Sequence, residues 1–85
     1  MAYVLKVDGT QEKIATPISI EKAQEVVGGY VERIKLGAGF IMLCNEDGKL
    51  EGKPVNRTAT LMLAGGTVVG DVIVCINKRE SKGWL

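Results

Sequence analysis

Apolar and polar residues alternate at the start of the chain. Tyr3, Leu5 and Val7 recur at every second position, the spacing that places side chains on one face of a β-strand. We therefore predict a first strand over residues 2–8. After a turn signal, residues 12–15 are compatible with a short second strand.

The apolar spacing changes to that of a helix near residue 19. Ser19 and Thr16 are both residue types that cap helix N-termini, and Gly28 suits the left-handed conformation that ends helices. We predict a helix over about residues 19–28. Its apolar stripe, which we expect to pack on a sheet, consists of Ile20, Ala23, Val26 and Val27.

Three further apolar segments predict the main strands of the sheet. Residues 30–36 and 40–45 flank a glycine-rich turn, and this short connection favours a hairpin. The second of these segments is almost wholly apolar, so we expect it to be central. The last strand is predicted over residues 71–76, after a Gly70-Asp71 step that we interpret as a tight turn or bulge. Residues 49–54 are expected to be irregular or briefly extended.

A second helix is predicted over residues 57–64, where Asn56 resembles an N-cap and Gly65-Gly66 ends the segment. Together these elements predict an α+β fold, a small antiparallel or mixed sheet of four to five strands with two short helices. We expect both helices to cover the same face of the sheet. The chain is interpreted as one domain over residues 1–85, with residues 78–85 as a flexible tail.

Composition narrows the classes of partner. The chain has 85 residues with 11 basic and 10 acidic side chains, so its net charge of +1 gives no field for binding DNA or an anionic membrane. No apolar stretch reaches the roughly 20 residues that span a bilayer, and no signal peptide is recognisable. Because the thiols carry no secretion signal with them, we expect a cytoplasmic protein. A domain this small has a marginal core, which favours a homo-oligomer.

The residue inventory argues against the common catalytic chemistries. There is no histidine, which excludes Ser-His-Asp and Cys-His arrangements and leaves a zinc site short of ligands. No phosphate-binding glycine loop is present. Cys44 and Cys75 both lie in apolar runs. They are compatible with small buried residues, or with a pair that forms a disulfide or binds a metal. We predict no enzyme activity, no cofactor and no metal. An enzyme that uses only carboxylates, lysine or arginine is the catalytic alternative.

Glu32 is the first candidate binding residue. It shares the more apolar face of its predicted strand with Tyr30 and Ile34, so its carboxylate must be paired, lie at a sheet edge or face a pocket. A salt bridge with a nearby lysine or arginine and a hydrogen bond to a ligand are both compatible with this position.

The start of the second helix is the other candidate. Asn56, Arg57, Thr58 and Thr60 combine a helix cap, a bidentate donor and two hydroxyls, which together suit an anion or a phosphate. Lys53 lies just upstream and adds positive charge. The same residues are also compatible with an ordinary capped helix whose polar side chains face solvent.

Several of these segments together resemble one family. They comprise Gly28-Gly29-Tyr30-Val31-Glu32, the turn Asp47-Gly48-Lys49-Leu50, the step from Pro54 to Thr60 with Asn56, and Gly70-Asp71 before an apolar strand. Over residues 20–76 this pattern is similar to a small domain of unknown function encoded mainly by bacteriophages, prophages and plasmids. Asn45 departs from the pattern, in which we expect an acidic residue. The resemblance implies a mobile-element origin and no assigned activity.

Our first hypothesis is therefore a phage or mobile-element accessory protein. It would bind and sequester a small anionic ligand, such as a nucleotide immune signal, and so counter host defence. In this hypothesis Tyr30 stacks on a base, Glu32 contacts a base or ribose edge, and phosphate is held by Asn56, Arg57 and Thr60.

A second hypothesis is an inhibitor or adaptor that acts on a host protein. Its contact would be a sheet edge or the C-terminal residues Trp84-Leu85, because an exposed tryptophan is a frequent anchor of protein interfaces. Trp84 is also compatible with folding back onto the core.

Overall fold

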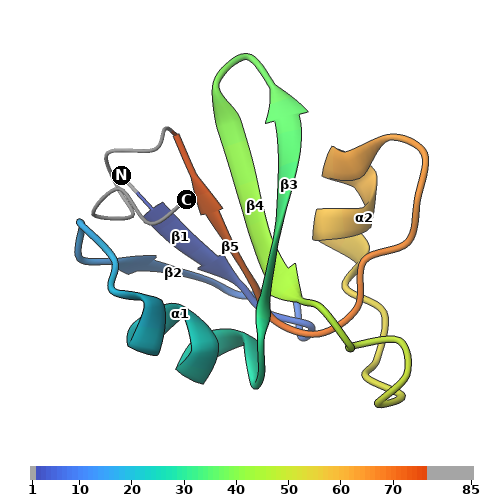
Figure 1. The fold of residues 1–85 in the computed structure, drawn as a ribbon. Coiled ribbons are helices and arrows are strands. Elements are labelled where there is room, and N and C mark those ends of the chain that lie inside the picture. The colour runs from blue at the N-terminus through green and yellow to red at the C-terminus, as the bar shows by residue number, and fades with distance from the viewer. Residues whose placement is uncertain (1, 77–85) are drawn as a thin grey trace.

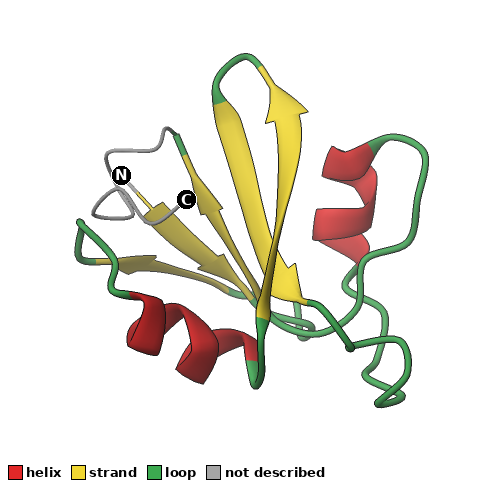
Figure 2. Ribbon diagram, viewed as in Figure 1, coloured by secondary structure: helices red, strands yellow, loops and turns green. Residues whose placement is uncertain are grey.

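The computed structural model describes residues 2–76, which form a five-stranded sheet with two helices (Figures 1 and 2). The predictions for residues 78–85, including those for Trp84 and Leu85, lie outside the described part of the chain. Within that part, no helix is long and apolar enough to cross a membrane. In chain order the elements are β1 (Ala2–Leu5), β2 (Gln11–Ile14), α1 (Ile20–Val27), β3 (Val31–Gly37), β4 (Phe40–Asn45), α2 (Arg57–Leu63) and β5 (Val72–Cys75).

Neighbouring strands of the sheet are antiparallel and follow the order β2-β1-β5-β4-β3. The predicted fold class is therefore confirmed, as is the interior position of β4. The middle strand is β5, which pairs with β1 on one side and β4 on the other and has all of its residues buried. Continuous apolar runs are typical of strands that are covered on both faces. This order leaves β2 and β3 at the two edges.

The two helices cover opposite faces of the sheet (Figure 1). Side chains alternate along β4, so that Ile41 and Leu43 join the cluster under α1, whereas Met42 and Cys44 join the cluster on the α2 side. Our expectation that both helices cover one face is wrong. The central strands present apolar side chains on both faces, and each face has to be shielded from water.

The helix α1 agrees with the sequence prediction. Ser19 Oγ accepts a hydrogen bond from the backbone N–H of Lys22 at 3.1 Å, which satisfies one free donor at the helix start. Gly28 ends the helix with a φ of 80°, in the left-handed region that favours glycine. Ala23 and Val27 are buried, and the helix packs over β4 and β5. Ile20, which we assigned to the packed stripe, is instead exposed at the first position of the helix. Local caps and an apolar stripe thus specify this element.

The helix α2 has a smaller apolar contact with the sheet. Ala59 is its one buried residue, whereas Leu61 and Met62 are exposed. Asn56 caps its start, because the side-chain Oδ1 accepts from the backbone N–H of Ala59 at 3.1 Å. With so little side-chain burial, α2 does not close onto the hairpin formed by β3 and β4.

Candidate functional site

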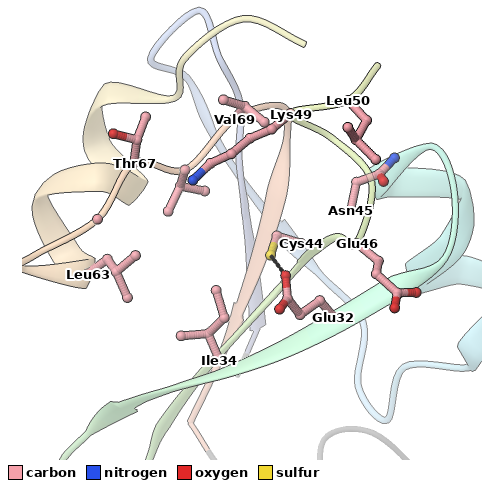
Figure 3. A pocket seen from close by; sticks show the side chains of 12 residues that line it. Glu32, Ile34, Cys44, Asn45, Glu46, Lys49, Leu50, Leu63, Thr67 and Val69 are labelled. Carbon is pink, nitrogen blue, oxygen red and sulfur yellow. Dashed lines mark hydrogen bonds between the residues drawn. The ribbon is translucent and has the colours of Figure 1, made fainter. Parts of the chain in front are cut away.

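A cleft of about 290 Å³ lies between α2 and the β3–β4 hairpin (Figure 3). Its floor comes from β3 and β4, one wall comes from the end of α2, and its rim comes from the turn after β4 and from residues 66–69. The volume is at the lower end of the range of roughly 300–1,000 Å³ that is usual for small-molecule sites. We refer to this space as the hairpin cleft.

Three charged side chains line the hairpin cleft. Glu32 comes from β3, and Glu46 and Lys49 come from the turn that follows β4. Figure 3 shows the Lys49 ammonium directed toward the side on which Thr67 lies, the Glu32 carboxylate across from it, and Glu46 pointing away from the middle. Two carboxylates and one ammonium give the lining a formal charge of −1.

Glu32 and Lys49 are both without an ionic partner in the described chain. The ion pairs within residues 2–76 join other residues, so the salt bridge that we considered for Glu32 does not form. Glu32 instead lies on an edge strand with its side chain exposed. An unpaired carboxylate and an unpaired ammonium on opposite sides of one cleft are available to a ligand with matching groups.

The Glu32 carboxylate has one contact within the cleft, with Cys44. The Cys44 Sγ donates to Glu32 Oε1 at 3.8 Å, and the two residues are direct partners across β3 and β4. Burial first, and then the negative charge and the hydrogen bond of Glu32, raise the pKa of the Cys44 thiol to about 11. The thiol is therefore protonated near neutral pH, which is the opposite of what a nucleophilic cysteine needs.

Apolar side chains separate the charged groups of the cleft. Ile34 forms part of the floor, Leu63 forms the wall on the α2 side, and Val68 and Val69 lie between the rim and the core. Leu50 stands at the rim with 88% of its surface exposed. Such a large apolar surface in water gains free energy when a ligand covers it.

Asn45 fixes the turn that carries Glu46 and Lys49. It is only 6% exposed, its Nδ2 donates to Val27 O at 3.1 Å and to Glu51 Oε1 at 3.0 Å, and its Oδ1 accepts from the N–H of Asp47 at 2.7 Å. A carboxylate could not make the two donor contacts. This explains why an amide stands where the family resemblance led us to expect an acidic residue.

Asn56 and Thr60, which we predicted to hold phosphate, are used by the fold. Asn56 is 1% exposed, and its Nδ2 donates to Leu5 O at 2.8 Å and to Gly70 O at 2.9 Å. Thr60 Oγ1 accepts from Val68 N–H at 2.9 Å and lies 3.3 Å from Val68 O. Neither residue lines the hairpin cleft. Their polar atoms connect α2 to β1 and to the segment before β5.

The remaining residues of the predicted phosphate cradle do not converge. Arg57 is exposed and Thr58 is half-buried, at the start of a helix that is only seven residues long. Lys53 lies apart from them, with its Nζ 3.8 Å from Glu51 Oε1. Its stem passes so close to Gly70 that a Cβ there would lie 2.9 Å from Lys53 Cδ. Lys53 thus packs between two loops, and none of the three lines the hairpin cleft.

Tyr30 does not share a site with Glu32. It precedes β3, is 69% exposed, and lines a second, more open concavity beside α1 with Gln24 and several carboxylates. The hairpin cleft holds Glu32 alone of the predicted binding residues. The period-two pattern placed Tyr30 and Glu32 on one face, but the strand begins only at Val31, and the chain before it turns toward α1.

Sequence reasoning missed Lys49, Leu63 and Thr67. Lys49 and Leu50 belong to the acidic-Gly-Lys-Leu turn that carried part of the family resemblance, so a signal for this turn was present. Leu63 and Thr67 carried no such signal, because their place opposite β3 depends on which face of the sheet α2 covers. Both cysteines are free and buried, as small apolar residues would be.

Comparison with known proteins gives one match. No curated protein and no solved structure is similar to this chain at a significant level. A protein-family model described as a domain of unknown function, DUF3846, matches residues 1–83. The resemblance to a domain of unknown function is confirmed to that extent, and the encoding by mobile elements stays a prediction. The chain belongs to the DUF3846 family.

Proposed function

We propose that this protein binds a small molecule in the hairpin cleft and that capture of this molecule, without chemical change, is its activity. The observation that carries the proposal is the pair of unpaired opposite charges, Glu32 and Lys49, across a cleft with apolar walls. Small-molecule sites combine apolar lining with a few convergent polar groups in this way.

The charges and the volume restrict the chemistry of the ligand. Glu32 suits a hydrogen-bond donor such as an exocyclic amine, Lys49 suits a single anionic group, and Ile34 and Leu63 suit a flat apolar body. A lining with a formal charge of −1 disfavours a ligand with several phosphates. We therefore narrow the anionic ligand of the sequence hypothesis to an amine-bearing ring with one negative group, of which a nucleoside monophosphate is an example.

Capture is favoured over catalysis by the protonation state of the Cys44 thiol in the cleft. The raised pKa of the Cys44 thiol keeps it protonated near neutral pH, and its sulfur already donates to Glu32. Within residues 2–76 no group of acidic or thiol side chains is arranged to hold a metal ion. A capturing protein that a mobile element encodes would act by removing a host signalling molecule, in the cytoplasm of the host.

The experiment is a ligand screen by thermal unfolding. The panel contains nucleosides, nucleoside monophosphates, cyclic dinucleotides, ADP-ribose derivatives and amino acids. A ligand present at about 100 times its Kd stabilises the fold by about 2.7 kcal/mol, which raises the Tm of a domain this small by roughly 10–20 °C. We expect an amine-bearing compound with a single anionic group to give the largest shift, and denaturation to release it unaltered.

Paired variants assign the binding to the hairpin cleft. Lys49→Ala and Glu32→Gln should each raise the Kd by about tenfold, because each removes one charge-assisted hydrogen bond. The matched controls are Lys13→Ala and Glu12→Gln on β2, far from the cleft in the sheet order. A panel without any stabilising compound, or a ligand whose Kd neither cleft variant changes, would refute the proposal. Recovery of a chemically altered ligand would favour the enzyme alternative.

A further inference from the structure

The strand β3 forms an open edge of the sheet. In the order β2-β1-β5-β4-β3 it has β4 as its single neighbour, and at seven residues it is longer than the four-residue β2 at the other edge. Figure 1 shows β3 beside β4, with α1 and α2 on either side of the sheet. An edge strand presents unpaired backbone donors and acceptors to any strand that can align with it.

The phase of the β3–β4 ladder identifies which backbone groups face outward. Glu46 N–H donates to Tyr30 O at 2.9 Å, so this pair is a hydrogen-bonded one. Because bonded and non-bonded pairs alternate in an antiparallel ladder, the backbone groups of Val31, Arg33 and Lys35 point away from β4. No other hydrogen bond in the described chain uses them. The irregular register between Lys35 and Gly37 ends this row.

The side chains of the same row carry uncompensated positive charge. Arg33 and Lys35 lie two residues apart, and therefore on one face of β3, and both are exposed. Neither forms an ion pair with any residue that the structure describes. At the other edge, by contrast, Glu12 of β2 is paired with Lys6 at 3.1 Å.

Like charges argue against a second copy of β3 at this edge. An antiparallel pair centred on Arg33 places the two arginines opposite each other, and one centred on Ile34 places Arg33 opposite Lys35. A pair centred on Glu32 places the two glutamates opposite each other. Like charges directly across a strand pair destabilise it. The occupant that fits is a strand with negative charges facing Arg33 and Lys35.

We propose that the β3 edge binds an extended segment of a partner protein that carries two acidic residues separated by one apolar residue. The acidic side chains lie opposite Arg33 and Lys35, and the apolar one lies opposite Ile34, which is half-buried on the other face. Backbone hydrogen bonds from Val31, Arg33 and Lys35 supply affinity, and the side-chain pairs supply specificity. This surface shares Ile34 with the hairpin cleft, whereas Arg33 and Lys35, whose charges select the partner, do not line the cleft.

The probe is an acetylated and amidated peptide, Thr-Glu-Val-Glu-Val-Thr, with Thr-Lys-Val-Lys-Val-Thr as its charge-reversed match. We expect the acidic peptide to bind more tightly than the basic one and to slow amide hydrogen exchange at Val31, Arg33 and Lys35. Amides of Gln11 and Lys13 on the opposite edge should be unaffected. Binding should weaken as salt is added, since the pairs at the edge are exposed to solvent.

A charge-reversed protein provides the decisive comparison. In the double variant R33E/K35E the Kd for the acidic peptide should rise by about tenfold or more and the preference between the peptides should invert. Lys49→Ala should leave the Kd unchanged, which separates this result from the proposed ligand binding. Absence of binding at millimolar peptide would overturn the proposal and leave Arg33 and Lys35 as charges that keep the edge from pairing. Protection located in the cleft or on β2 would overturn it as well.

Discussion

Glu32 and Cys44 act as a coupled pair at the centre of the hairpin cleft. The register of β3 and β4 places them directly opposite each other, and the thiol donates to the carboxylate at 3.8 Å. The negative charge of Glu32 disfavours the Cys44 thiolate. The carboxylate therefore keeps Cys44 in the thiol form, which donates its hydrogen to Glu32. The second carboxylate oxygen of Glu32, Oε2, is then free to accept from a ligand.

This coupling predicts the reactivity of Cys44. We expect slow alkylation of Cys44 by iodoacetamide at pH 8, with a rate that rises as the pH approaches the thiol pKa of about 11. Glu32→Gln should lower that pKa and speed the reaction, whereas Glu12→Gln should not. Mapping of labelled peptides by mass spectrometry separates Cys44 from Cys75. An unchanged rate in Glu32→Gln would mean that burial alone sets the pKa.

The same shift has a consequence for stability at high pH. Since the pKa in the folded chain lies above the ordinary value of 9.0, the contribution of this thiol to the free energy of unfolding is complete below pH 9. It is lost as the pH rises toward about 11. Stability measured between these values should fall less steeply in Glu32→Gln, in which the thiol pKa is closer to its ordinary value.

At the scale of elements, α2 is attached to the sheet mainly through polar side chains. Asn56 connects its start to β1 and to Gly70, and Thr60 connects its first turns to Val68. At the Gly70-Asp71 step, which we interpreted as a tight turn or bulge, Gly70 has a φ of 76° and Asp71 accepts from Val7 N–H at 2.9 Å. These contacts hold the helix in place while the hairpin cleft stays open beside it.

The amide of Asn56 should therefore matter more than its capping oxygen. Asn56→Asp keeps the acceptor for Ala59 N–H but removes both donor contacts in a buried site, so we expect a loss of about 2–4 kcal/mol in the free energy of unfolding. Ser19→Ala, which removes a solvent-exposed cap on α1, should cost only about 1 kcal/mol. Urea unfolding measures both values. A loss in Asn56→Asp no larger than that in Ser19→Ala would contradict a structural role for the amide.

At the scale of the whole molecule, the two faces of the sheet are covered unequally. The α1 face is closed by a helix with two buried residues, Ala23 and Val27, together with Ile18 from the preceding segment. The α2 face is closed by a helix with one buried residue, and the hairpin cleft remains beside it. Local opening is expected where few apolar contacts hold an element. The face with the cleft is therefore the more adaptable one.

Amide hydrogen exchange tests this asymmetry. We expect the amides of β5 to exchange only through global unfolding, because that strand lies in the middle of the sheet with both neighbours in place. Amides near the end of α2 should exchange at least about tenfold faster than those near the end of α1. Native-state exchange followed by NMR gives both rates. Equal protection of the two helices would show that the polar contacts of α2 hold it as firmly as apolar burial holds α1.

The sequence by itself determined the features that depend on neighbouring residues. The strand and helix spacings, the Ser19 and Asn56 caps and the Gly28 terminus all rest on contacts within a few residues, and the structure contains each of them. Local patterns of this kind suffice to identify elements and the α+β class.

Only the tertiary structure decided where these elements meet. The central strands have apolar side chains on both faces, so α1 and α2 had to divide between them, and this division placed Leu63 and Thr67 across from Glu32. It also buried the side chain of Asn56, which donates to Leu5 O and Gly70 O. Tyr30 came to lie on the α1 side. Strand order and the choice of face minimise the exposed apolar surface of the whole chain, a quantity that no short segment of sequence contains.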